Sequence, residues 1–210
     1  MAFDGIVTKA IASELQQLSG ARIDKIFQPN KNTVLLGFYL DGSNYLLNIC
    51  VEAQNYRIHL TTHAKPNPKV APNFCMVLRK HLLGLHIKSI TTNNLERLVI
   101  IDFEGFDDVD DIISKRLIIE LMGKHCNIIL LDEQNIIIDS LRHINSEGST
   151  RSIVPHVKYS YPETSKSNFL ACLSSQDFCQ KLSSDGSVYD VFNGISKSFI
   201  DSSFPERNNQ

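Results

Sequence analysis

The sequence predicts an α+β protein: mainly antiparallel strands that form a β sandwich or a partly closed barrel with two inserted helices, followed by a short helical segment. Two observations predict this class. About nine short apolar runs follow one another with turn residues between them, and only two segments among them repeat apolar residues at helical spacing. Strands without intervening helices favour an antiparallel sheet. The runs are almost continuously apolar, so two packed sheets or a barrel would bury both their faces.

The first element is a helix over residues 4–18. Asp4 stands at the N-cap position, Gly20 follows the end, and apolar residues repeat every three or four positions as one buried face. A Pro-rich loop at residues 64–73 leads into the second helix, at residues 74–83. Strands are predicted at residues 22–29, 33–40, 44–51, 56–61, 85–91, 97–105, 116–123, 126–131 and 135–141.

The composition changes towards the C-terminal end. Residues 157–168 form a polar linker, and residues 169–182 and 187–200 have helical patterns. We expect one domain over residues 1–162, with residues 163–210 as a linker and the start of a second, helical domain. Two helices without a third partner make an incomplete core, so we expect the chain to end partway through that second domain.

The net charge and the cysteine pattern limit which partners and which cellular compartment we expect. The 210 residues include 21 Lys+Arg and carry a formal net charge of −2 at pH 7, which excludes a uniformly basic nucleic-acid-binding coat but allows a local basic face. None of the cysteines forms a C-x-x-C pair, and Cys50, Cys75 and Cys126 lie in apolar runs, as reduced buried cysteines do. With no signal peptide and no apolar run long enough for a membrane span, we expect a cytoplasmic protein without a membrane partner.

Motifs for catalysis and cofactor binding are absent. The sequence has no G-x-S-x-G nucleophile elbow, no P-loop, no dinucleotide-binding G-x-G-x-x-G and no H-E-x-x-H zinc motif. His59 and His63 are four residues apart, but in a strand-to-loop region where this spacing does not bring side chains together. No Cys/His spacing fits a structural zinc site. We therefore expect no enzyme activity, no cofactor and no metal.

Several signature segments occur in a fixed order. They are FDG at residues 3–5, FCMVLRKH at residues 74–81, the dipeptide Glu96-Arg97, and ELMGKHCN at residues 120–127. Together they resemble the N-terminal domain of the NFACT family, the fibronectin-binding protein A-like factors of bacterial ribosome-associated quality control.

The resemblance continues to the end of the chain, with a few departures. FNGISKSFI at residues 192–200 resembles the opening of the family's helix-hairpin-helix domain. Cys126 stands where serine is usual, and His156 where glycine commonly follows proline. Glu96 replaces the aspartate of some members, and this departure bears on the binding site.

The resemblance implies a fold similar to the N-terminal domain of formamidopyrimidine-DNA glycosylases, with a binding function instead of bond chemistry. Family members bind a large ribosomal subunit that still carries peptidyl-tRNA on an obstructed chain. They recruit tRNA, alanyl-tRNA in bacteria, so that a non-templated alanine tail extends the stalled chain. The implied partners are therefore tRNA and the large ribosomal subunit with its rRNA.

The tRNA-binding residues that the resemblance implies are Asp4, Glu96 and Arg97. Asp4 has an alternative explanation as a helix N-cap, worth about 1 kcal/mol. Because Glu96 and Arg97 are adjacent, a regular strand would point them to opposite faces, and both can line one site only if the chain bends. Asn93-Asn94 just upstream favours such a bend. A guanidinium such as that of Arg97 can bind phosphate in a fork or stack on a base.

Four further residues could contact phosphate without reading sequence: Arg79, Lys80, Lys124 and His125. Each pair has a simpler explanation. Arg79 and Lys80 could form the solvated face of a helix. Lys124 and His125 follow Gly123 in a tight turn, which could present a lysine and backbone amides to phosphate or be a plain hairpin.

Two other functions are considered. The glycosylases use a proline exposed directly after the initiator methionine, followed by glutamate, whereas this chain has Ala2 and Phe3, so the amine nucleophile is missing. The other is a fibronectin- or fibrinogen-binding surface-associated protein with an extracellular matrix partner, as the family's older name implies. The chain has no signal peptide, anchor or repeat array of the kind that surface adhesins use.

Overall fold

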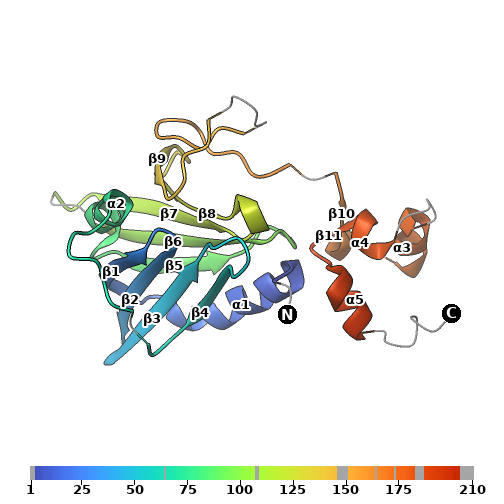
Figure 1. The fold of residues 1–210 in the computed structure, drawn as a ribbon, viewed down its shortest axis with the longest axis horizontal. Helices are drawn as coiled ribbons and strands as arrows, with labels where there is room; N and C mark the ends of the chain where they lie inside the picture. The colour runs from blue at the N-terminus through green and yellow to red at the C-terminus, as the bar shows by residue number, and fades with distance from the viewer. Residues whose placement is uncertain are drawn as a thin grey trace.

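The computed structural model describes residues 3–63, 65–106, 109–145, 151–163, 165–172, 174–182 and 187–203. Its dominant feature is one antiparallel sheet in the order β4-β3-β2-β1-β5-β6-β7-β8-β9 (Figure 1). The strands are β1 (Arg22–Asn30), β2 (Thr33–Leu40), β3 (Ser43–Cys50), β4 (Arg57–Leu60), β5 (His86–Thr91), β6 (Leu98–Phe106), β7 (Ile112–Glu120), β8 (Asn127–Leu131) and β9 (Ile137–Ser140). Each predicted run forms a strand, and the α+β class is confirmed.

The predicted sandwich or barrel is wrong, because the strands form one open sheet. Its two halves, β4 to β1 and β5 to β9, meet through a short β1–β5 pairing with a single registered pair, Arg22 with His86. Both strands have irregular register beside this junction, between Ile23 and Lys25 in β1 and between Ile87 and Ser89 in β5. Such bulges bend a strand. Side chains from both halves therefore share one core, as the inner faces of a sandwich would.

Two helices complete this core. α1 (Gly5–Leu15) continues into the 3-10 helix η1 (Gln16–Leu18), as the periodicity predicts, and buries Ala12, Leu15 and Leu18. α2 (Asn73–Leu82) packs near β1. It buries Phe74, Cys75, Leu78 and Leu82. In Figure 1, α2 lies at the end of the sheet opposite the C-terminal helices.

The outer face of β6 to β9 is covered by the chain that follows β9. Ile153 and Tyr159 pack there on a second cluster that contains Leu98, Ile118 and Ile129. Tyr159 is only 8% exposed, so the first residues of the predicted 157–168 linker are part of the domain instead. Burial of both faces in this part of the sheet explains why β6 and β8 are almost continuously apolar.

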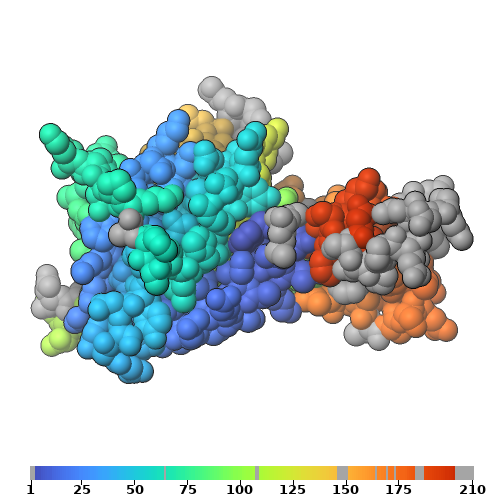
Figure 2. All heavy atoms as spheres, turned by 60° about the horizontal axis from the view of Figure 1, so that its bottom comes forward, coloured from blue at the N-terminus to red at the C-terminus, as the bar shows by residue number. Residues whose placement is uncertain are grey.

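The C-terminal segment lies beside the N-terminal end of α1 and projects beyond the sheet (Figures 1 and 2). Its elements are β10 (Ser167–Asn168), η3 (Phe169–Ala171), α3 (Ser175–Leu182), α4 (Val188–Val191), β11 (Phe192–Asn193) and α5 (Lys197–Ser203). The predicted continuous helix at 187–200 is wrong, because β11 leaves the helix to pair in parallel with β10. The φ of Gly194 is +79°, a left-handed conformation that also interrupts a helix. Phe192 is fully buried and stacks on Phe178 with 5.0 Å between ring centroids.

Candidate nucleic-acid interface

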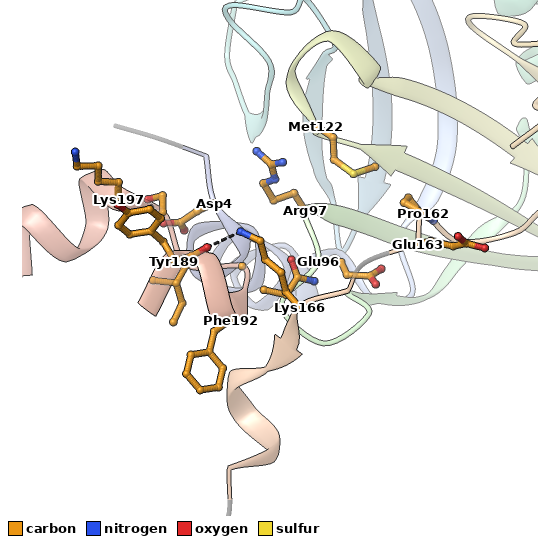
Figure 3. A pocket seen from close by; sticks show the side chains of 14 residues that line it. Asp4, Glu96, Arg97, Met122, Pro162, Glu163, Lys166, Tyr189, Phe192 and Lys197 are labelled. Atoms are coloured by element: carbon orange, nitrogen blue, oxygen red, sulfur yellow. Dashed lines mark hydrogen bonds between the residues drawn. The ribbon is translucent and has the colours of Figure 1, made fainter. Parts of the chain in front are cut away.

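A cavity of about 410 Å³ lies between the sheet domain and the C-terminal segment (Figure 3). We call it the junction cavity. The sheet domain contributes Asp4, Glu96, Arg97 and Met122 to its lining. The following chain contributes Pro162, Glu163, Lys166, Tyr189, Phe192, Asn193, Gly194, Ile195, Ser196 and Lys197. The structure therefore brings together all three residues that the sequence predicts for tRNA binding.

Asp4 uses both carboxylate oxygens inside the protein. Oδ1 accepts from the Val7 amide at 3.0 Å, which confirms the predicted N-cap of α1. Oδ2 accepts from the Ser196 hydroxyl at 2.7 Å, and Ser196 Oγ in turn accepts from the Phe199 amide at 3.1 Å as the cap of α5. Asp4 is only 4% exposed. Its carboxylate thus joins the N-terminal ends of two helices at the edge of the cavity.

A turn directly before β6 positions Glu96 and Arg97. Asn94 has a φ of +53°, and the Glu96 amide donates to the Asn93 carbonyl at 3.0 Å. The chain bends where Asn93-Asn94 predicts a bend, and Arg97 precedes the first strand residue, Leu98. The regular alternation of a strand therefore does not separate the two side chains, and both line the junction cavity.

Arg97 presents a cation to solvent from a fixed backbone. Its carbonyl accepts from the Leu121 amide at 2.7 Å, which continues the β6–β7 ladder by one residue. The side chain is exposed. Within the described part of the chain, the guanidinium has no hydrogen-bond or ion-pair partner. It is therefore available for an anionic ligand.

Glu96 is half-buried, and the burial raises the pKa of its carboxyl group. Asn93 Nδ2 donates to Oε2 at 3.0 Å and partly opposes this rise in pKa. The nearby Glu120 carboxylate adds to the rise, whereas Arg151 lowers the pKa. Proton uptake by Glu96 is therefore easier than for a solvated glutamate.

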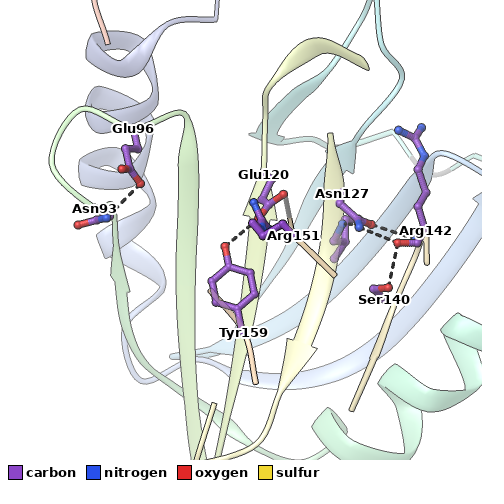
Figure 4. Close-up of polar contacts among 9 residues, drawn as sticks. Asn93, Glu96, Glu120, Asn127, Ser140, Arg142, Arg151 and Tyr159 are labelled. Atoms are coloured by element: carbon purple, nitrogen blue, oxygen red, sulfur yellow. Dashed lines mark hydrogen bonds and ion pairs between the residues drawn. The ribbon is translucent and has the colours of Figure 1, made fainter. Parts of the chain in front are cut away.

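A buried polar network stands behind Glu96 (Figure 4). Glu120, at the end of β7, accepts from the Tyr159 hydroxyl at 2.7 Å and from Arg151 at 2.5 Å. The Arg151 guanidinium also lies 5.3 Å from the centre of the Tyr159 ring. Sequence reasoning missed the role of Arg151 and Tyr159, because their side chains meet Glu120 only after the chain folds back over the sheet.

The predicted phosphate contacts lie in two different places. Lys124 and His125 are exposed in a 3-10 turn, η2 (Gly123–His125), next to the cavity residue Met122. Arg79 and Lys80 lie on α2, at the other end of the molecule (Figure 1). Arg79 Nε donates to the Ile26 carbonyl at 2.9 Å, and its guanidinium lies 5.9 Å from the Phe27 ring centre, which explains Arg79 structurally.

The structure gives no sign of a metal centre in the described ranges, where no group of three or more His, Cys, Asp and Glu side chains is placed to hold an ion. Cys50, Cys75 and Cys126 are free and buried, as the sequence predicts. Burial raises the pKa of the Cys126 thiol to about 11. No helix in the described part of the chain is both long and apolar enough to cross a membrane.

The fold and the ordered signature segments define a class of protein. The family described as "NFACT N-terminal and middle domains" matches residues 4–203. The chain therefore belongs to the NFACT family, as its segments indicate.

Relatives place the chain more closely within that family. It is 36% identical over 211 residues to the Rqc2 homolog RqcH of Bacillus subtilis, in an alignment that covers 95% of this chain and 36% of that protein. The archaeal Rqc2 homolog aRqcH of Methanocaldococcus jannaschii is 35% identical over 156 residues, which cover 72% of this chain and 22% of the relative. The chain is thus a homologue of ribosome quality control factors, and spans about a third of the length of the bacterial relative.

Two solved structures share the fold. The N-terminal domain of fibronectin-binding protein PavA from Streptococcus pneumoniae superposes with a TM-score of 0.87 and 29% identity, covering 100% of this chain and 85% of that one. The N-terminal part of the fibronectin/fibrinogen-binding protein of Streptococcus suis gives a TM-score of 0.85 and 32% identity, covering 93% of this chain and 76% of that one.

Proposed function

We propose that this chain is the tRNA- and large-ribosomal-subunit-binding module of a ribosome quality control factor that recruits tRNA for non-templated alanine tailing of stalled nascent chains. The module acts by selective binding, without catalysis, cofactor or metal, in the cytoplasm. The tRNA is alanyl-tRNA, and the ribosomal partner is the large subunit with its peptidyl-tRNA and rRNA. Homology to the Rqc2 homologues supports this proposal.

One observation carries the proposal. Asp4 and the distant Glu96-Arg97 pair line a single cavity (Figure 3), and the exposed Arg97 guanidinium has no hydrogen-bond or ion-pair partner among the described residues. The two carboxylates are held by the protein, Asp4 through Val7 and Ser196 and Glu96 through Asn93. A cation with no internal partner favours a phosphate ligand.

The test is replacement of Arg97 by alanine in the intact protein. We expect Arg97→Ala to weaken tRNA binding and to flatten the slope of log affinity against log salt by about one unit, because one phosphate contact is lost. Arg22→Ala is the matched control, since Arg22 is also exposed but pairs with Asp24 at 2.9 Å away from the cavity. Unchanged affinity and slope in Arg97→Ala would remove this residue from the proposed site.

The partners are tested separately from the site. Capture of the intact protein from cells, followed by sequencing of the bound RNA, should recover tRNA specific for alanine together with large-subunit rRNA. Recovery of neither RNA above the level of a tag-only control contradicts the proposal.

Binding to extracellular matrix protein is the second candidate function, favoured by the structural similarity to a fibronectin-binding and a fibronectin/fibrinogen-binding protein. Labelling of intact cells with a reagent that cannot enter them separates the two candidates. We expect the protein to stay unlabelled until the cells are lysed. Label on the protein of intact cells would favour the adhesin.

We propose a likeness to the glycosylase N-terminal domain for the fold alone and not for the enzymatic activity. Phe3 stands where the enzymes have glutamate, and Ala2 lies outside the described residues. Incubation with a duplex that contains an oxidised base, in the presence of borohydride, is expected to trap no adduct. A trapped adduct would show an amine nucleophile and overturn the non-enzymatic proposal.

A further inference from the structure

The C-terminal segment supplies a second unpaired cation to the junction cavity. Lys197 lines the cavity at the first position of α5, and its side chain is exposed. Like Arg97, it has no hydrogen-bond or ion-pair partner within the described ranges. In Figure 3, Lys197 lies on the wall formed by the C-terminal segment and Arg97 on the wall formed by the sheet domain, with Asp4 between them.

Close backbone contacts hold these two walls together. The Gly5 amide donates to the Gly194 carbonyl at 2.9 Å. A Cβ atom on either glycine would collide with the Leu95 carbonyl oxygen, so the three backbones meet without room for a side chain. Leu95 is two residues before Arg97, and Ser196, which binds Asp4 at 2.7 Å, directly precedes Lys197. The backbones that carry the two cations are therefore held together by close contacts and one partly buried hydrogen bond.

Among the described residues, none of the acidic side chains at the cavity forms an ion pair with either cation. Asp4 is buried, and each of its carboxylate oxygens accepts a hydrogen bond from the protein. Glu96 is half-buried and accepts from Asn93. Glu163 is exposed on the opposite side of the cavity in Figure 3, away from Lys197. The cavity thus offers two cations, neither with an ion-pair partner in the part of the chain that the structure describes, to an anion with more than one phosphate.

We propose that Arg97 and Lys197 together clamp the phosphodiester backbone of an unpaired RNA segment, so that the tRNA site is shared between the sheet domain and the C-terminal segment. This inference rests on the proposed function and adds Lys197 to its binding residues. A concave cavity of about 410 Å³ suits a splayed nucleotide and not a duplex, whose shape is read over many base pairs. Tyr189 and Met122 line the same cavity and offer apolar surface to an unpaired base.

The experiment compares the salt dependence of tRNA binding by single and double variants of the intact protein, with a tRNA transcript as the probe. We expect Lys197→Ala to lower affinity about tenfold at low salt and to reduce the salt slope by about 0.7 to 0.9, one phosphate contact. Arg97→Ala/Lys197→Ala should reduce the slope by about twice that amount. Lys197→Gln, which keeps the aliphatic stem, should behave like Lys197→Ala, and Lys197→Arg should retain the slope.

Lys69→Ala is the matched control, because Lys69 is exposed and lies outside the junction cavity, so its loss changes net charge equally. An unchanged slope in Lys197→Ala and Lys197→Gln, together with a reduced slope in Arg97→Ala, would overturn the shared site and leave the proposed function standing. Unchanged slopes in both Arg97→Ala and Lys197→Ala would overturn both. An equal loss in Lys69→Ala would show that only net charge acts, which also contradicts a built clamp.

Discussion

A single buried carboxylate organises the polar interior behind the junction cavity. The Glu120 side chain is 3% exposed and is held by Arg151 at 2.5 Å and by the Tyr159 hydroxyl at 2.7 Å. A buried carboxylate persists only where a cation and hydrogen-bond donors compensate for lost hydration. Burial raises the pKa of the Tyr159 hydroxyl, and the Glu120 carboxylate raises it further. The hydroxyl therefore remains a donor over the whole stable pH range.

Removal of this carboxylate should be costly. We expect Glu120→Ala to lower the free energy of unfolding by about 3 kcal/mol, because it removes a buried carboxylate that accepts from both Arg151 and Tyr159. Tyr159→Phe removes a single hydrogen bond to a charged group and should cost about 1.5 kcal/mol. Urea unfolding measures both. Glu104→Ala is the control, since Glu104 is 45% exposed in its pair with Lys88 and should change stability by less than about 1 kcal/mol.

A loss in Glu120→Ala no larger than in Glu104→Ala would show that the network contributes nothing to stability.

The side-chain partners of charged residues limit what a sequence can predict. The sequence treats Arg79 and Arg97 alike as possible phosphate ligands. In the structure the Arg79 Nε donates to the Ile26 carbonyl, whereas Arg97 stays free at a cavity. Only the presence or absence of an internal acceptor separates the two arginines, and this depends on tertiary packing.

At the level of elements, the contact of Gly5, Leu95 and Gly194 connects the C-terminal segment to the sheet domain. Gly194 has a φ of +79° and has no space for a Cβ atom, because the Leu95 carbonyl and side chain fill it. Gly20 also has a left-handed φ, of +83°, but a Cβ atom there would meet nothing within 4 Å. A substitution at Gly20 therefore tests backbone strain alone, whereas a substitution at Gly194 tests backbone strain together with a close contact.

Substitution of Gly194 should loosen the C-terminal segment. Gly20→Ala carries only left-handed strain, about 1–2 kcal/mol. Gly194→Ala carries the same strain and a collision with Leu95, so we expect the hydrogen bond from the Gly5 amide to the Gly194 carbonyl to break. Amide hydrogen exchange of Gly5, normalised to Ile119 in the core of β7, measures this. Protection of Gly5 in Gly194→Ala equal to that in Gly20→Ala would contradict the contact.

The elements themselves were largely predictable. Nine strands and the two domain helices lie where apolar runs, turn residues and the Asp4 cap predict them, because these signals act between residues close in sequence. The helix expected at 187–200 is broken instead. Phe192 and Asn193 pair with Ser167 and Asn168, and Gly194 packs on Leu95. These partners are too distant in the sequence for a local pattern to indicate them.

At the scale of the whole molecule, one arginine connects the two halves of the sheet. Arg142, which follows β9, donates to the Cys126 carbonyl at 2.8 Å beside β8. It also donates to Asn32 Oδ1 at 2.9 Å, in the β1–β2 turn, and to the Val51 carbonyl at 2.8 Å, after β3. A planar guanidinium can serve three acceptors in different directions, which an ammonium group cannot do in the same geometry.

Replacement of Arg142 should therefore weaken the connection between the two halves of the sheet. We expect Arg142→Ala to lower the free energy of unfolding by about 2–4 kcal/mol through the loss of hydrogen bonds from a charged group to three partly buried acceptors. Arg142→Lys should recover less than half of this loss. Chemical denaturation checks both variants, with Arg22→Ala as the exposed control. Equal stability of Arg142→Ala and Arg22→Ala would show that the two halves hold together without this residue.

The amino-acid sequence was sufficient for the α+β class, the strand positions, the cap at Asp4 and the membership of the NFACT family, because each depends on short-range patterns or ordered segments. Only the tertiary structure shows that the strands form one bent sheet and that Asp4, Arg97 and Lys197 line one cavity. Both depend on contacts between residues that are distant in the chain. Such contacts follow from how bulges, glycine backbones and buried hydrogen bonds fit together in three dimensions.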